Sequence, residues 1–198
     1  MGNTLKYEAM ELSSLEKKII IESWLALRRK LSKCGQTFIL IFLDEHPEYL
    51  ALFPIKYRGN PDLAEILGLK VMRELSRIIS NLDGLSGIAG YLRGVAENHQ
   101  RRHINSKAYD DFRLSYLKML RKHLAGYKHM SLYLQCWDKL LRLINTIVLD
   151  IITDIEKKAP ASQVKLNDQS GQIQITPKYE PVERSSTTVK ENNTPPML

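Results

Sequence analysis

The chain has 198 residues, of which 43% are hydrophobic and 26% are charged, proportions that are ordinary for a globular protein and exclude a low-complexity or fibrous chain. Its formal net charge is +7, and because basic and acidic side chains balance within residues 159–198, the excess belongs to the rest of the chain. The basic side chains are scattered over polar helix faces without interleaved aromatic residues, so we expect a solvated surface and no nucleic-acid interface, with an anionic partner or surface as the alternative.

The first predicted elements are an arm and a helix. Residues 1–12 show no periodicity and are expected to form a flexible arm. Ser13 and Glu16 have the spacing of a capping box, in which each side chain bonds the backbone amide of the other, and predict a helix start. Apolar residues then recur at helical spacing and predict one buried face: Ile20, Trp24, Leu27 and Leu31.

A second, almost wholly apolar helix is expected to follow. We expect Cys34-Gly35 to break the first helix, and the second to run from Phe38 to Asp44. His46-Pro47 ends it, because proline disfavours helical geometry in the residue before it. A short helical turn, residues 48–52, and a polar loop, residues 55–60, come next.

Two further helices carry the residues of most chemical interest. Pro61 suits the first position of a helix, where its missing amide costs nothing. The apolar face of this helix is Leu63, Leu67, Val71, Leu75 and Ile78. After a loop through Gly84 and Gly87, a weaker helix ends near His99. Its inward residues are Ile88, Tyr91, Leu92 and Val95.

The last two helices complete an all-α pattern of seven or eight helices. The first begins at Ser106, and its apolar side is Tyr109, Phe112, Tyr116, Met119 and Leu120. Gly126 interrupts the pattern. The stripe of the final helix is Trp137, Leu141, Ile144, Val148, Ile151 and Ile155. We expect one domain over residues 13–158 and a disordered tail over 159–198, which holds five of the eight prolines.

The compartment is predicted from the cysteines and the N-terminus. Cys34 and Cys136 lie far apart, without a secretory signal, and are expected to be reduced thiols in the cytoplasm. Apolar runs are too short to span a bilayer. Gly2 could accept a myristoyl group, but Lys6 stands where that motif has Ser or Thr. Membrane contact is therefore expected only if Gly2 is modified.

His99 is the candidate ligand of the sequence. It closes a helix with an apolar inner face and precedes a polar corner. A neutral imidazole commonly binds iron or zinc, although a single helical histidine does not by itself predict a metal. No Ser/His/Asp or paired-carboxylate pattern predicts a dedicated catalytic site.

The pattern as a whole resembles the globin family, and within it the animal intracellular globins of the divergent invertebrate, nematode-like kind. The resemblance covers residues 13–157. Its elements are Trp24, His46-Pro47-Glu48 followed by Phe53, residues 67–72, and His99 with Ile104 and Tyr109 downstream. Their joint order and spacing, more than any single residue, carries the resemblance.

The resemblance implies haem b, iron protoporphyrin IX, with His99 as the proximal iron ligand. His103 is the rival ligand, one turn later. Ile104 and Tyr109, five and ten residues after His99, stand where globins commonly keep haem-packing and helix-packing residues, and they favour His99. His103 would then lie near a haem propionate or be an ordinary surface histidine.

The resemblance also implies the other contacts of the haem. Phe53 would stack on the haem, and Val71 would lie over its distal face. Ile39 would fill the back of the distal pocket, although a small helix shift would exchange it with Phe38. Lys70 would reach a propionate or be an ordinary solvated lysine.

Leu67 stands at the distal position, where many globins have histidine or glutamine. A donor there stabilises bound dioxygen by about 1.5–3 kcal/mol, and leucine can neither donate nor bind iron. The resemblance thus implies a five-coordinate ferrous haem that binds a diatomic gas (oxygen, carbon monoxide or nitric oxide) in an apolar pocket. The alternative function is that of a haem-based redox or sensor protein, and a third possibility is a globin fold that serves as a scaffold without haem. Haem-mediated nitric oxide or peroxide chemistry also stays open.

Overall fold

The computed structural model describes residues 11–53 and 62–158, and within them every regular element is a helix. The elements are α2 (Ser14–Arg28), α3 (Leu31–Glu45), the 3₁₀ helix η1 (Pro47–Leu52), α4 (Leu63–Ile79), α5 (Leu85–Gln100), α6 (Ser106–His123) and α7 (Met130–Lys158). This confirms the predicted all-α class. Several predictions fall outside the described residues. They concern the arm through residue 10, the loop and Pro61 within 54–61, the tail, and the side chain of Ile88.

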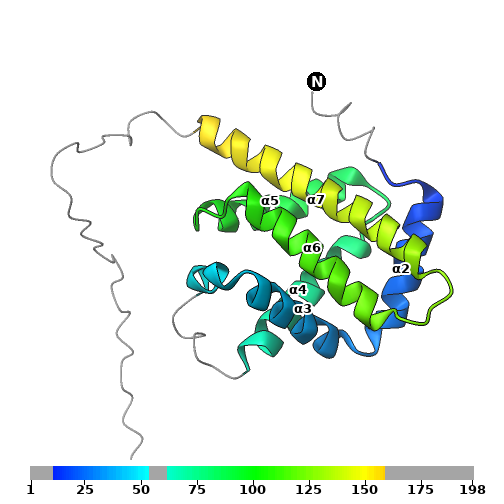
Figure 1. The fold of residues 1–198 in the computed structure, drawn as a ribbon. Coiled ribbons are helices and arrows are strands. Elements are labelled where there is room, and N and C mark those ends of the chain that lie inside the picture. The colour runs from blue at the N-terminus through cyan, green and yellow to red at the C-terminus, as the bar shows by residue number, and fades with distance from the viewer. Residues whose placement is uncertain (1–10, 54–61, 159–198) are drawn as a thin grey trace, which may run out of the picture. The chain divides into compact units, whose positions relative to one another are not determined.

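The helices pack in two connected groups (Figure 1). α3 packs against α4 and α6, while α7 packs against α2, α5 and α6. The aromatic rings of Phe38, Tyr116 and Trp137 form a continuous core between the groups, with centroids 5.6 Å and 5.5 Å apart along the series. All three side chains are fully buried, so α3, α6 and α7 share one core.

The start of α2 follows its sequence signal. Ser13 donates its amide to Glu16 Oε2 at 2.7 Å, and the Glu16 amide donates to Ser13 Oγ at 3.2 Å, which confirms the capping box. Glu16 also pairs with Lys139 of α7 at 2.8 Å. Leu12, the last residue of the expected arm, is buried. This end of α2 is therefore held to the rest of the domain.

The expected break at Cys34-Gly35 is wrong. α2 ends at Arg28, Leu31 belongs to α3, and α3 runs through Gly35 without interruption. Glycine in a helix interior is unfavourable by roughly 1 kcal/mol relative to alanine, but here α3 crosses α4. A Cβ built on Gly35 would lie 2.5 Å from the backbone of Gly68. Close approach of two backbones therefore overrides local helix propensity.

The connection between α6 and α7 agrees with the prediction from the sequence, whereas the connection between α4 and α5 is shorter than predicted. Gly126 has a φ of 88° between α6 and α7, a left-handed conformation that suits glycine, so the predicted interruption is confirmed. α5 begins at Leu85 after Gly84, earlier than expected, and Gly87 lies within its first turn. Glycine is tolerated there because the first amides of a helix have no intrahelical partner. No described helix is both long and apolar enough to cross a membrane.

Candidate functional site

The crossing of α3 and α4 fixes one wall of the candidate site. Leu67 immediately precedes Gly68 at the crossing and is 7% exposed, while Val71, one turn later, is half-buried. Ile39 lies one turn after Gly35 and is buried, so it follows the side of α3 that faces α4. The three apolar side chains therefore belong to neighbouring surfaces of two helices.

Phe38, the rival of Ile39, is directed elsewhere. Its ring packs edge-on against Phe112 and Tyr116 of α6, with centroids 4.7 Å and 5.6 Å away. Phe38 is therefore a core residue between α3 and α6, and Ile39 is the better candidate for the α4 side.

His99 lies in the last turn of α5 and is half-buried. Its Nδ1 lies 3.0 Å from Tyr109 Oη, and within the described residues the ring has no hydrogen bond through Nε2. Burial, with a smaller effect from the charge of Arg102, lowers the pKa of His99 below its ordinary value. The imidazole is thus neutral at neutral pH, the form that binds metals, and Nε2 is available as a ligand.

The corner after His99 has a defined backbone. His103 is exposed and has a φ of 52°, a left-handed conformation that turns the chain. The Ile104 amide donates to the His99 carbonyl at 3.2 Å, and the half-buried Ile104 side chain packs against the core. Asn105 then caps α6 by accepting from the Ala108 amide at 3.0 Å. The two histidines thus differ in burial, and only His99 is directed towards the interior.

Tyr109 lies in the first turn of α6, where it is buried against the end of α5. Burial raises its pKa to about 12, so the hydroxyl is a neutral phenol. Asn145 of α7 donates Nδ2 to the Tyr109 carbonyl at 3.0 Å. The tyrosine is therefore fixed by two helices.

The remaining candidate residues lie nearer the surface. Phe53 follows η1, is half-buried and packs against the core. Lys70 is exposed on α4. A basic side chain at this depth could reach a carboxylate that faces solvent.

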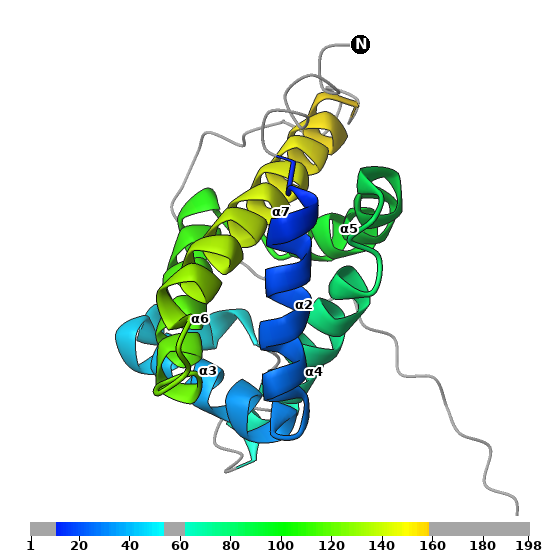
Figure 2. The same ribbon diagram turned by 90° about the vertical axis from the view of Figure 1, so that its right-hand side faces the viewer.

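The two helices that carry the main candidates are held by different partners. α4 packs chiefly against α3, whereas α5 packs against α7. Both lie to the right of α2 in Figure 2. The residues of α4 and the imidazole of α5 thus stand on separately supported elements.

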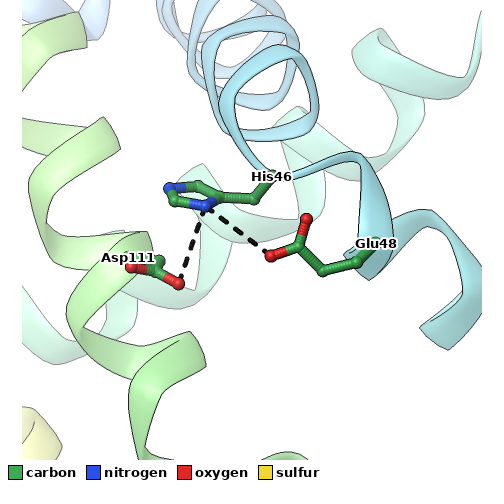
Figure 3. A group of neighbouring side chains, drawn as sticks. All are labelled: His46, Glu48 and Asp111. Atoms are coloured by element: carbon green, nitrogen blue, oxygen red, sulfur yellow. Dashed lines mark ion pairs between the residues drawn. The ribbon is translucent and has the colours of Figure 1, made fainter.

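A second polar cluster joins η1 to α6 (Figure 3). His46 Nδ1 lies 3.6 Å from Asp111 Oδ2 and 3.9 Å from Glu48 Oε1. These are metal-ligand types, but Asp111 Oδ2 already accepts from Tyr49 Oη at 2.6 Å and from Lys107 Nζ at 2.5 Å. The ammonium of Lys107 supplies the positive charge that a cation would bring. We therefore interpret the cluster as a clamp that holds η1, and hence the segment leading to Phe53, against α6.

Sequence reasoning missed this clamp. Tyr49 and Asp111 are 62 residues apart, and neither belongs to a motif that pairs them. The one local signal is the spacing of Lys107 and Asp111, which places opposite charges one helical turn apart.

Comparison with known proteins agrees with this arrangement. A model of the globin family matches residues 36–148, more than half of the chain. The chain is also 25% identical over 142 residues to neuroglobin from Dissostichus mawsoni, a match that covers 68% of this chain and 88% of that protein. The protein belongs to the globin family. Membership in this family implies a haem cofactor and diatomic gases as ligands.

Proposed function

We propose that this protein binds haem b through His99 Nε2 and takes a diatomic gas (oxygen, carbon monoxide or nitric oxide) on the opposite face, beside Leu67 and Val71. The observation that carries the proposal is the state of His99. Its ring is half-buried, its pKa is lowered, and its Nδ1 is already engaged by Tyr109, so that Nε2 alone is left to bind. When bound, the haem supplies an iron centre with one position open to a gas.

The other candidates have roles that fit their burial. Phe53 and Ile39, apolar and at least half-buried, would pack against the porphyrin and the back of the gas pocket. Ile104 would support the haem beside the proximal ligand. Lys70 and His103, both exposed, would lie at the edge where the propionates meet water.

Leu67 determines the chemistry of the distal side. A leucine side chain offers no hydrogen bond and no ligand atom, and this leucine is buried, with 7% of its surface exposed. A gas that depends on a hydrogen bond, such as dioxygen, would be held less well there than carbon monoxide. The joint order and spacing of Trp24, the HPE corner and His99 is why we place the chain among the divergent intracellular invertebrate globins. We also place it in the cytoplasm, where its thiols would stay reduced.

The absorption spectrum of the reduced, haem-reconstituted protein tests this proposal. We expect a five-coordinate high-spin ferrous spectrum that converts to a carbon monoxide complex without displacement of a protein ligand. A six-coordinate low-spin spectrum in the absence of added gas would contradict it, because some side chain would then occupy the distal position.

A haem-based redox or gas-sensing role is the second candidate, and Leu67 is the observation that favours it. Storage of dioxygen is poorly served by a site that lacks a distal donor, whereas sensing or electron transfer does not need one. The rate at which the reduced protein oxidises in air distinguishes the two. Oxidation within minutes favours the redox or sensor role, and persistence over hours favours reversible carriage.

A further inference from the structure

The imidazole of His99 and the phenol of Tyr109 meet across the corner between α5 and α6. Nδ1 of His99 lies 3.0 Å from Tyr109 Oη, and the ring centroids are 5.6 Å apart with planes tilted by 55°. Tyr109 is 8% exposed, so water has little access to compete for its hydroxyl. The contact is therefore a specific polar interaction between a half-buried imidazole and a buried phenol.

The backbone on both sides holds the two rings in register. At one end, the His99 carbonyl accepts the Ile104 amide at 3.2 Å after the left-handed turn at His103. At the other end, Asn145 of α7 donates to the Tyr109 carbonyl at 3.0 Å. These two hydrogen bonds fix the backbone positions from which the two rings extend.

The chemistry of a metal-binding histidine indicates which atom of this contact donates the hydrogen bond. An imidazole that binds metal through Nε2 carries its proton on Nδ1, and that N–H is normally donated to a neighbouring acceptor, which fixes the tautomer and the ring plane. Tyr109 Oη has the lone pairs to accept it. A neutral phenol is a weaker acceptor than a carboxylate, so the ligand keeps the character of a neutral imidazole.

We infer that Tyr109 is the positioning residue of the proximal site: its hydroxyl oxygen accepts a hydrogen bond from His99 Nδ1 and thereby presents Nε2 to the haem. This inference rests on the proposed haem binding by His99. It assigns to Tyr109 a polar role beyond the packing expected of an aromatic residue at this place.

The test compares Tyr109→Phe with Tyr116→Phe. Tyr116 lies two turns further along the same helix and is fully buried, and its hydroxyl has no hydrogen-bond partner within the described residues. Both variants therefore lose one buried hydroxyl, but only Tyr109→Phe loses a contact with His99.

We expect the iron–histidine stretching band of reduced Tyr109→Phe, measured by resonance Raman spectroscopy, to move to lower frequency than in the parent. We also expect haem to pass to an excess of a haem-scavenging apoprotein roughly tenfold faster, in line with the loss of other hydrogen bonds to metal ligands. Tyr116→Phe should match the parent in both measurements. Equal frequencies and equal rates of haem loss in the parent and Tyr109→Phe would overturn the inference.

A second measurement uses the parent alone, in case Tyr109→Phe does not fold. With zinc protoporphyrin as a diamagnetic probe, the Nδ1 proton of His99 should exchange slowly with solvent and show a nuclear Overhauser effect to the ring protons of Tyr109. Rapid exchange without that effect would overturn the inference. Failure of the proposed function looks different, because the parent would then bind no haem or His99→Ala would retain it.

Discussion

Gly35 and Gly68 bring the backbones of α3 and α4 into direct contact, since a Cβ built on Gly68 would lie 2.1 Å from the carbonyl carbon of Gly35. No real side chain fits at that distance. The contact fixes how α4 is rotated against α3, and thereby sets where Leu67 and Val71 lie relative to Ile39. The composition of the candidate gas pocket thus depends on two residues that have no side chain.

Gly68→Ala tests this crossing. Alanine has the higher helix propensity by about 1 kcal/mol, but forcing the backbones apart costs about 1–3 kcal/mol or more, so we expect net destabilisation in urea unfolding. Gly94→Ala is the matched control, because Gly94 is also helical and a Cβ there meets nothing within 4 Å. Gly94→Ala should be neutral or stabilising, and equal effects of the two variants would contradict the account.

Asp111→Asn tests the clamp between η1 and α6. Burial alone raises the pKa of Asp111, but hydrogen bonds from Lys107 and Tyr49, with the nearby His46, outweigh it and hold the pKa below its ordinary value. A carboxylate of lowered pKa stabilises the fold above about pH 4, and this stability is lost as pH falls through the folded-state pKa.

The variant should therefore be less stable than the parent at pH 7, by about 1.5–3 kcal/mol for hydrogen bonds to a charged group. The difference should shrink as the pH of the unfolding experiment approaches the folded-state pKa of Asp111. Asp110→Asn alters the ion pair between an exposed carboxylate and the buried Arg113, which keeps its other partner Asp138, so it should cost no more than about 1 kcal/mol. A constant difference between parent and Asp111→Asn from pH 7 to acid would refute the role of the charge.

Ser23→Ala tests the polar link between α2 and α7. Trp137 Nε1 donates to Ser23 Oγ at 2.9 Å, and Ser23 Oγ donates to the Ile20 carbonyl at 2.9 Å, in a fully buried setting. Removal of the hydroxyl leaves a buried indole N–H without its acceptor, a loss of about 1–3 kcal/mol in the free energy of unfolding. Ser14→Ala, at an exposed position of the same helix, should change it by no more than about 0.5 kcal/mol.

Leu67→His tests the proposal that an apolar residue at position 67 weakens dioxygen binding. If the apolar side chain is the cause, a donor at this position should slow dioxygen dissociation by roughly tenfold or more, the equivalent of a hydrogen bond of about 1.5–3 kcal/mol. Leu67→Met, which conserves volume and polarity, should leave the dissociation rate near that of the parent. The same rate in both variants would show that residue 67 does not face the gas.

Local signals in the sequence are sufficient for most of the helices and for the family. The capping box at Ser13 and Glu16 depends on residues three apart, and the buried faces follow helical periodicity, so both were predictable. The break expected at Gly35 does not occur, because the glycine is required by the close approach of Gly68 on another helix. A prediction that uses only residues close in sequence cannot detect a contact between two helices.

The candidate site was predictable in outline only. Spacing identified His99 and noted an aromatic residue at Tyr109, but the hydrogen bond between them depends on the left-handed turn at His103. The Asp111 clamp was missed for a similar reason, since its partner Tyr49 is distant in sequence. To predict a hydrogen bond between side chains on either side of a turn, one must know the geometry of the turn. No pattern in this sequence specifies that geometry.

Haem retention by His99→Ala and His103→Ala tests the central claim most directly. Each variant is expressed with haem, and haem content per folded protein is measured from the absorption spectrum, with folding checked by circular dichroism. We expect His99→Ala to lose haem and His103→Ala to keep it with the parent's spectrum, because of these two histidines only His99 is half-buried with its second nitrogen engaged. Retention of haem by His99→Ala, with loss in His103→Ala, would contradict the proximal assignment and every role derived from it.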